Sequence, residues 1–234
     1  MRVLGSTRSI PTRQYVATTQ VGSLSMFGVY KWQQDAVGWG TRYPIATFNS
    51  ETGYDARFSP DNAYIVTTTA TTVKMFPFTF GGIGTVISGG PSKSLSNPNA
   101  GLSWHPDQNA VGWGDNRQAT APTMHVTRWN GTSWGTNYSQ PATQPLGAVN
   151  STRFNDAGDY FFSSSTDDPG IFAYPWTSAS GFGTKKANPA TLPALVTTIK
   201  TIADEDVVMS QQDSPYVVAY PFISSWGTKY ANPA

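Results

Sequence analysis

Carboxylates, histidines and arginines are the residues of this sequence that could carry chemistry, and they are few. The chain holds 14 Asp and Glu residues, of which Glu51 and Glu205 are the glutamates. A glycosidase needs two or three carboxylates that converge on one site. Most aspartates here, among them Asp61, Asp107 and Asp156, instead occupy turn positions where a side chain bonds nearby backbone. The sequence therefore predicts no carboxylate-based active site.

Metal and nucleophile chemistry is restricted in the same way. The two histidines, His105 and His125, exclude a three-histidine metal site, and the absence of cysteine excludes thiolate ligands and Cys nucleophiles. His105 lies in a Trp-His-Pro-Asp corner that indicates a structural turn. Asp167-Asp168 reads as a solvated turn, and the acidic run 204–206 lacks the spacing and glycine of a calcium loop. We therefore expect no metal, no cofactor and no enzyme activity.

Three arginines share one position of a repeated pattern. Arg8, Arg57 and Arg153 each come just before the apolar residue of an expected inner strand, where the other repeats have Ser103 and Thr201. Inner strands of a radial fold surround its axis, so three guanidinium groups there could hold an anion or an acidic partner segment. The alternative is that they bond carbonyl groups or nearby acids of their own chain.

Four aromatic residues are candidate surface contacts. Trp39, Trp134, Phe182 and Trp226 each precede a Gly-Thr pair and an expected outer strand. Aromatic rings that are partly exposed at such positions can contact a protein or a sugar. Packing into the core is the competing interpretation.

The elements that must position these residues repeat five times. Gly-Thr pairs begin at residues 40, 84, 135, 183 and 227, about 47 residues apart. A strand that ends on an aromatic residue, as in Ala173–Trp176, recurs with the same period, and so does a corner of the form Phe58–Asp61. A positive φ is the simplest explanation for the glycine of each Gly-Thr pair.

Each repeat reads as four short strands joined by turns. A β-sandwich does not require a repeated sequence, whereas blades packed around an axis do. We predict an all-β fold, a five-bladed β-propeller with four-stranded antiparallel blades, as a single domain over residues 1–234. Its blades would span approximately 1–47, 48–91, 92–143, 144–191 and 192–234. The inner-strand positions expected in the core are Phe58, Trp104, Phe154 and Ile202.

Charge and hydropathy limit the kinds of binding partner that the sequence predicts. The formal charge is +1, from 15 Lys and Arg against 14 Asp and Glu, so no strong field attracts nucleic acid or a membrane surface. No run of 18 apolar residues occurs, and the segment 1–14 lacks the apolar region of a signal peptide. We expect no nucleic-acid partner, no membrane partner and no signal peptide.

The last two repeats resemble a known family. Residues 174–176 read Tyr-Pro-Trp, and residues 181–193 read Gly-Phe-Gly-Thr-Lys-Lys-Ala-Asn-Pro-Ala-Thr-Leu-Pro. Residues 226–234 repeat this as Trp-Gly-Thr-Lys-Tyr-Ala-Asn-Pro-Ala. The pattern resembles the WD40-like β-propeller repeat of bacteriophage virion proteins, in which a Gly-Thr-Lys-x-x-Asn-Pro-Ala-x-Leu-Pro linker recurs. The second repeat keeps the family's Phe-Ser-Pro-Asp corner but not its linker.

The resemblance implies a structural protein of the virion. It would be a head decoration, tail or fibre component that acts as a rigid protein-interaction disc, made in the host bacterial cytoplasm. The implied partners are other virion proteins of the capsid or tail, in multiple copies through the particle's symmetry. The alternative is a carbohydrate-binding five-bladed lectin with sugar sites between blades, which would bind a host-surface glycan.

Overall fold

The structure is a computed structural model of the whole chain. It describes residues 14–19, 27–33, 38–43, 53–69, 71–79, 81–92, 101–115, 123–166, 168–202 and 206–232. Within these ranges the chain forms antiparallel strands joined by turns, with no helix. Accordingly, no described segment is a helix of the length and apolarity needed to cross a bilayer.

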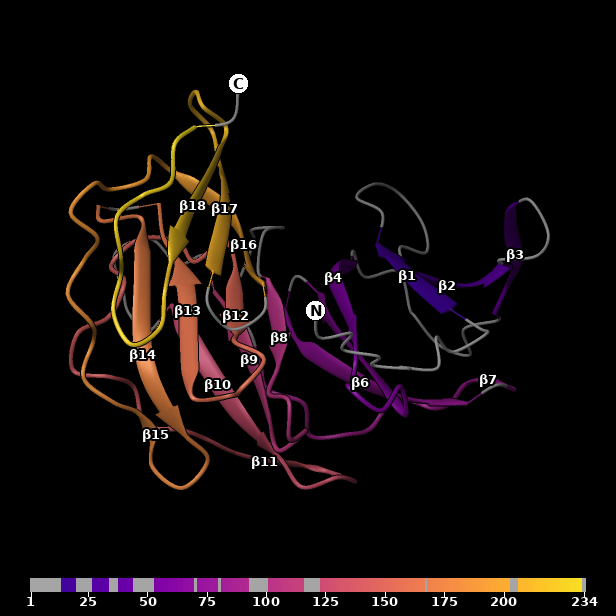
Figure 1. Cartoon of the computed structure of the whole chain (residues 1–234). Coiled ribbons are helices and arrows are strands. Elements are labelled where there is room, and N and C mark those ends of the chain that lie inside the picture. The colour runs from indigo at the N-terminus through magenta and orange to yellow at the C-terminus, as the bar shows by residue number, and fades with distance from the viewer. Residues whose placement is uncertain are drawn as a thin grey trace, which may run out of the picture.

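The strands assemble into five antiparallel sheets, each taken from one continuous stretch of chain (Figure 1). Three sheets have four strands. The first of these three consists of β4 (Gly53–Phe58), β5 (Tyr64–Thr69), β6 (Val73–Thr79) and β7 (Gly82–Ile83), and the second of β8 (Leu102–Trp104), β9 (Ala110–Gly114), β10 (Met124–Trp129) and β11 (Trp134–Asn137). The third consists of β12 (Thr152–Phe154), β13 (Tyr160–Ser164), β14 (Ile171–Thr177) and β15 (Gly181–Phe182). In the described part of the chain the other two have three: β1 (Gln14–Thr19), β2 (Phe27–Gln33) and β3 (Gly38–Arg42); β16 (Val196–Ile202), β17 (Asp206–Gln211) and β18 (Val217–Pro221).

These sheets are blades of a β-propeller. The first strands of four of them, β4, β8, β12 and β16, lie next to one another in sequence order and form an inner wall (Figure 1). The first strand of the first sheet, β1, packs against β4 of the next sheet. The predicted all-β propeller with antiparallel, four-stranded blades is thus confirmed in its fold and blade type, while the first and last sheets show three strands each among the described residues. Four of the sheets line up as blades through their first strands, and the predicted number of five blades stays a prediction.

Hydrophobic cores lie between neighbouring blades, because both faces of a blade are covered. On β13, Phe161 packs with Val126 of the preceding blade, whereas the adjacent Phe162 packs with Met209 and Tyr220 of the following one. Successive residues of a strand point to opposite faces. This is why the inner blades have apolar residues at consecutive positions rather than an alternating pattern.

Three of the four predicted inner-strand core residues are in hydrophobic clusters. Trp104 and Phe154 are buried, and Phe58 is half-buried against its cluster. The prediction for Ile202 is wrong, because its side chain is 53% exposed. Ile202 is the last residue of β16 and pairs with Asp206 at the end of the ladder, so no blade covers it among the described residues.

The repeated corner has one backbone form. Its fifth residue has a left-handed φ in three blades, 61° at Asn62, 59° at Gln108 and 77° at Gly158. A side chain closes each turn: Ser59 Oγ accepts the Tyr64 N–H at 2.9 Å, and His105 Nδ1 accepts the Asp107 N–H at 3.1 Å. The other ring nitrogen, Nε2, is 3.0 Å from the Gly158 carbonyl of the next blade. The predicted structural role of His105 is therefore confirmed.

The glycines of the Gly-Thr pairs are not explained by a positive φ, and that prediction is wrong. In three blades the glycine instead donates its N–H to the carbonyl of a third-strand proline at 2.7–2.9 Å: Gly84 to Pro77, Gly183 to Pro175 and Gly227 to Pro221. A Cβ on these glycines would lie 3.3, 3.1 and 2.6 Å from the same prolines. The Gly-Thr and Tyr-Pro or Phe-Pro markers recur together because the glycine and the proline are in contact.

Candidate functional site

Arg57 lies on the inner strand β4 and is paired with a carboxylate. Its guanidinium nitrogen is 3.2 Å from Asp55 Oδ2, and the Arg57 side chain is 40% exposed. The same oxygen accepts the backbone N–H of Leu102 on β8 at 2.9 Å, so this carboxylate also joins two blades. Arg57 Nε is buried and has no acceptor among the described residues. The Arg57 guanidinium therefore keeps donors that Asp55 does not use.

Arg153 occupies the matching position on β12. Its Nε donates to Thr201 Oγ1 on β16 at 3.3 Å, and a terminal nitrogen is 3.7 Å from the carboxylate of Asp156. Burial lowers the pKa of Arg153, the Asp156 charge raises it, and the positive charge of Arg57 lowers it. Arg57 and Arg153 occupy equivalent positions on two inner strands, β4 and β12.

Lys200 lies on the inner strand β16, one residue before Thr201, and is exposed. Burial lowers the pKa of Lys200, as do the charges of Arg57 and Arg153, whereas Asp55 raises it. The Lys200 ammonium has no hydrogen bond or ion pair with any described residue. We call Arg57, Arg153 and Lys200 the inner cationic cluster.

Side-chain acceptors fix the spacing of the inner strands that carry this cluster. Ser103 Oγ on β8 accepts the Phe154 N–H of β12 at 2.7 Å. Ser151 Oγ, just before β12, accepts the Ile199 N–H of β16 at 3.2 Å. The carboxylate on β4 does the same for β8. Each inner strand is therefore hydrogen-bonded to the next through a side chain, which holds the cationic groups on a rigid wall.

The predicted ring of three arginines is described only in part. The structure places Arg57 on β4 and Arg153 on β12, at equivalent positions of two inner strands, whereas Arg8 lies outside the described residues, so the ring stays a prediction. Sequence reasoning missed Lys200 because it compared a single inner-strand position, and Lys200 lies one residue before it. The signal that could have found Lys200 was a long cationic side chain on an inner strand. Such a side chain can reach the axis whichever face of the strand it is on.

The candidate aromatic contacts are half-buried rather than free. The rings of Trp134, Phe182 and Trp226 pack edge-on against core aromatics, at centroid distances of 5.5 Å for Trp129–Trp134, 5.4 Å for Phe161–Phe182 and 4.9 Å for Phe222–Trp226. Trp39 lies on β3, and its side chain is outside the described part. Their use as surface contacts stays a prediction, and the packing shows a structural role for the three that are described.

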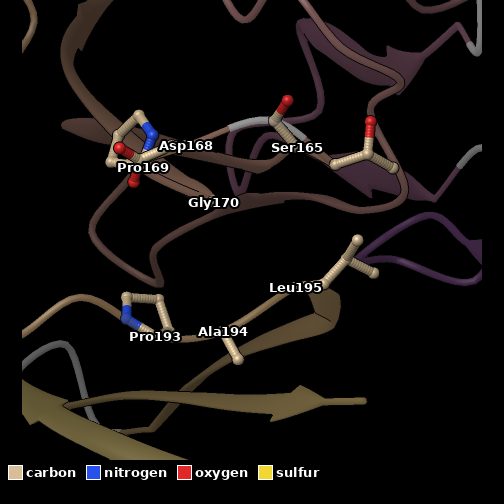
Figure 2. Close-up of a pocket in the computed structure, with 8 residues that line it drawn as sticks. Ser165, Asp168, Pro169, Gly170, Pro193, Ala194 and Leu195 are labelled. Carbon is tan, nitrogen blue, oxygen red and sulfur yellow. The ribbon is translucent and has the colours of Figure 1, made fainter. Parts of the chain in front are cut away.

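A pocket of about 170 Å³ lies between the last two blades (Figure 2). One wall is the β13–β14 connection, and the other is the segment before β16. The lining residues are Ser165, Thr166, Asp168, Pro169, Gly170, Pro193, Ala194 and Leu195. Figure 2 shows Asp168 and Pro169 across the opening from Ala194 and Leu195. The exposed carboxylate of Asp168 has no hydrogen-bond partner among the described residues.

Apolar side chains are exposed around this pocket. We define the linker face as Leu146, Pro169, Leu192 and Tyr216, of which the first, third and fourth are 70%, 40% and 63% exposed. Hydrogen bonds connect its parts: Thr166 donates its N–H to Ala148 O at 3.0 Å, and Gln211 Oε1 accepts the Ala194 N–H at 2.9 Å. The segments that carry the linker face are thus hydrogen-bonded to the two walls of the pocket.

No group of three or more His, Cys, Asp or Glu side chains is arranged to hold a metal ion in the part of the chain that the structure describes. Asp168 belongs to the pocket, while its neighbour Asp167 lies outside the described residues. The described chemistry is therefore concentrated in the inner cationic cluster and the linker face.

No family model matches the sequence, and no curated protein sequence matches it. Solved structures do match the fold. A candidate 6-phosphogluconolactonase from Bacteroides uniformis superposes with a TM-score of 0.63 at 13% identity, over 90% of this chain and 64% of that chain. The WD40 repeats of RRP9 superpose with a TM-score of 0.55 at 11% identity, over 88% of this chain and 53% of that chain.

These likenesses show a WD40-like β-propeller fold. This chain spans less than two thirds of the length of either matched protein. The candidate lactonase contradicts our prediction that the chain is not an enzyme, because a protein with this fold is described as one. At 13% identity the likeness shows the fold alone, and it transfers no reaction to this chain. The prediction failed because it treated a missing motif as an exclusion, although propellers host many functions.

Proposed function

We propose that this chain is a five-bladed propeller that serves as a rigid protein-interaction disc of a bacteriophage virion, in its head decoration, tail or fibre. It would assemble with capsid or tail proteins in multiple copies after synthesis in the host cytoplasm. The five successive antiparallel sheets support the blade number. The resemblance of residues 174–193 and 226–234 to the WD40-like repeat of phage proteins supports the setting.

The linker face is the observation that carries this proposal. Exposed leucine and tyrosine side chains gathered on one surface are typical of protein contacts rather than of a free surface. Leu192 belongs to the repeat linker that resembles the phage family and is 40% exposed, so part of the resembling motif lies on this face. Because the scaffold is rigid, little conformational freedom is lost when this face binds a partner.

Binding to particles tests the proposal. The purified chain is mixed with particles of the phage that encodes it, prepared without this protein, and sedimented. We expect stoichiometric co-sedimentation, and a roughly tenfold or greater loss of affinity for Leu146→Ser combined with Tyr216→Ser, since central apolar anchors contribute most of an interface's energy.

The matched control is Ile223→Ser. Ile223 is 77% exposed and follows β18, at the opposite end of that strand from Tyr216. This variant should bind like the wild type. Absence of the chain from gradient-purified particles, together with no binding to them, would contradict the proposal.

The pocket favours a second candidate function, the inter-blade sugar site of a lectin. Hydroxyl groups of Ser165 and Thr166, the Asp168 carboxylate and apolar proline rings form the mixed lining that small polar ligands use. A glycan array would show binding to one sugar class, abolished by Asp168→Asn. Particle binding without any glycan binding would leave the interaction disc as the function.

A further inference from the structure

We propose that the pocket between the last two blades receives a positively charged side chain, an ammonium or a guanidinium, from the protein that docks on the linker face. This role depends on the proposed interaction disc and specifies the chemistry that the partner must offer. The expected partner segment has a basic residue for the pocket and apolar residues beside it for Leu146, Leu192 and Tyr216.

The pocket has the size of one side chain. Its volume is about 170 Å³, whereas sites that enclose a drug-sized ligand have about 300–1,000 Å³. Pro169, Pro193 and Leu195 supply apolar lining, and the Asp168 carboxylate lies across the opening from Leu195 (Figure 2). Lysine and arginine combine an apolar stem with a charged end, so the stem would contact the prolines while the charged end reaches Asp168.

The backbone of the lining offers few hydrogen-bond donors. Three of its N–H groups already donate within the chain at 2.9–3.0 Å, those of Ser165, Thr166 and Ala194. Pro169 and Pro193 have no N–H. An anion would therefore find few partners in this pocket.

Hydrogen-bond acceptors, in contrast, remain free for a ligand. The Asp168 carboxylate and the carbonyl groups of Pro193 and Ala194 accept no hydrogen bond from the described part of the chain. Both carbonyl oxygens lie beside Gly170, where a Cβ would be 3.2 Å from Ala194 O and 3.6 Å from Pro193 O. The φ of Gly170 is 74°, which favours glycine and so keeps the space in front of these oxygens clear. Ammonium and guanidinium groups are donors only, with three and five N–H groups, and therefore match this lining.

The local charge also favours a cation, although the net charge of the chain is +1. Three aspartates and no lysine or arginine occur in the segments that carry the pocket and the linker face, residues 145–149, 165–170, 191–195 and 211–217. Gln211 joins the loop of Asp213 to the pocket wall, because its Oε1 accepts the Ala194 N–H at 2.9 Å and its Nε2 donates to Asp213 O at 3.2 Å. Charge complementarity of this kind selects a partner with a basic residue at the matching position.

Amide NMR spectra of the isotope-labelled full chain test the pocket. The probes are N-acetyl-arginine amide, N-acetyl-lysine amide, the neutral isostere N-acetyl-citrulline amide and methyl glucoside, each titrated at constant ionic strength. We expect saturable shifts of the Gly170 and Leu195 amide signals with at least one of the two cations. Binding of the citrulline probe should be roughly tenfold weaker or less than that of the arginine probe, the range for losing a hydrogen bond to a charged group.

Variants locate the binding. Asp168→Asn should weaken binding of the cationic probe roughly tenfold, and Ala194→Leu should abolish it by filling the pocket. Asp156→Asn is the matched control, because Asp156 is an exposed aspartate at the opposite end of β13 from the pocket. This control should bind as the wild type does. Thermal unfolding verifies the folding of each variant.

The outcomes separate this inference from the interaction disc. Absence of cation binding, equal binding of the arginine and citrulline probes, tighter binding of methyl glucoside than of either cation, or unchanged binding by Asp168→Asn would overturn the cation site. Particle binding that survives Asp168→Asn at full affinity would also overturn it, while the disc itself would stand. A chain that binds the cationic probes but no particle would instead contradict the disc and support the cation preference of the pocket.

Discussion

Replacing Gly227 with alanine tests whether the Gly-Thr turn needs glycine for its contact with proline. A Cβ at this position would lie 2.6 Å from Pro221 Cγ, where ordinary contacts begin at 3.4 Å. Such overpacking costs about 1–3 kcal/mol. Alanine also reduces the conformational entropy of the unfolded chain, which raises the free energy of unfolding by about 0.4–1 kcal/mol. The expected net loss in the free energy of unfolding is therefore about 1.3 kcal/mol, the centre of a range from about 0 to 2.6 kcal/mol.

Two other glycines form a graded comparison. The same Cβ would be 3.1 Å from Pro175 at Gly183, and 3.3 Å from Pro77 at Gly84. The proline therefore needs to move less for an alanine at residue 183 than at residue 227, and least at residue 84. Gly183→Ala should therefore cost less than Gly227→Ala, and Gly84→Ala should be within about 0.5 kcal/mol of the wild type.

Urea unfolding followed by tryptophan fluorescence measures the three variants. Hydrogen exchange of the residue 227 amide, which donates to Pro221 O at 2.9 Å, gives a local readout of the turn. Pro221→Ala removes Cγ and leaves contacts at 3.4 Å to the carbonyl oxygen and 3.5 Å to Cβ of residue 221, so it should partly rescue Gly227→Ala in a double-mutant cycle. Equal losses in all three glycine variants, or an unchanged Gly227→Ala protein, would refute the contact explanation.

Three further predictions concern other parts of the fold. Ser103→Ala removes the acceptor of the buried Phe154 N–H and should lower the free energy of unfolding by about 1–3 kcal/mol in a urea titration. Burial raises the pKa of Tyr174 above its ordinary value of 10.0; the unfolded chain ionises first, so stability is complete below pH 10 and falls above it, and tyrosinate absorbance should rise together with unfolding. Lys185 Nζ donates to Asn188 Oδ1 in an exposed linker, so Asn188→Ala should cost less than about 1 kcal/mol and lower Tm by at most about 4 °C.

Repetition in the sequence was sufficient to predict the blade and its corner. His105 was correctly expected in a turn because the residues around it match the Ser59 corner of the preceding blade. The reason for the Gly-Thr glycine was not predictable in this way. Its constraint is a contact with the third-strand proline, as in Gly183 with Pro175, and a contact across a turn does not show in the type of a single residue.

The candidate site was predictable only where residues align between repeats. Arg57 and Arg153 were found because they share one position. Lys200 was not, because side chains from both faces of an inner strand can reach the axis and a comparison of one position samples one face. The linker face was also missed, since the exposure of Leu146 and Tyr216 depends on which neighbouring segments cover them.

The hydrogen bonds between inner strands give the chain a direction. In three of these hydrogen bonds the earlier blade contributes a side-chain acceptor and the later blade contributes the backbone donor. Others run the opposite way, as when Arg153 Nε donates to Thr201 Oγ1 of the later strand. A blade that leaves the ribosome and folds therefore presents a ready template for the strand synthesised next. The acceptor is an aspartate in one pair and a serine in the others, so exchanging whole repeats between positions would place a charge where a hydroxyl belongs. Such an exchange of repeats should therefore lower the free energy of unfolding.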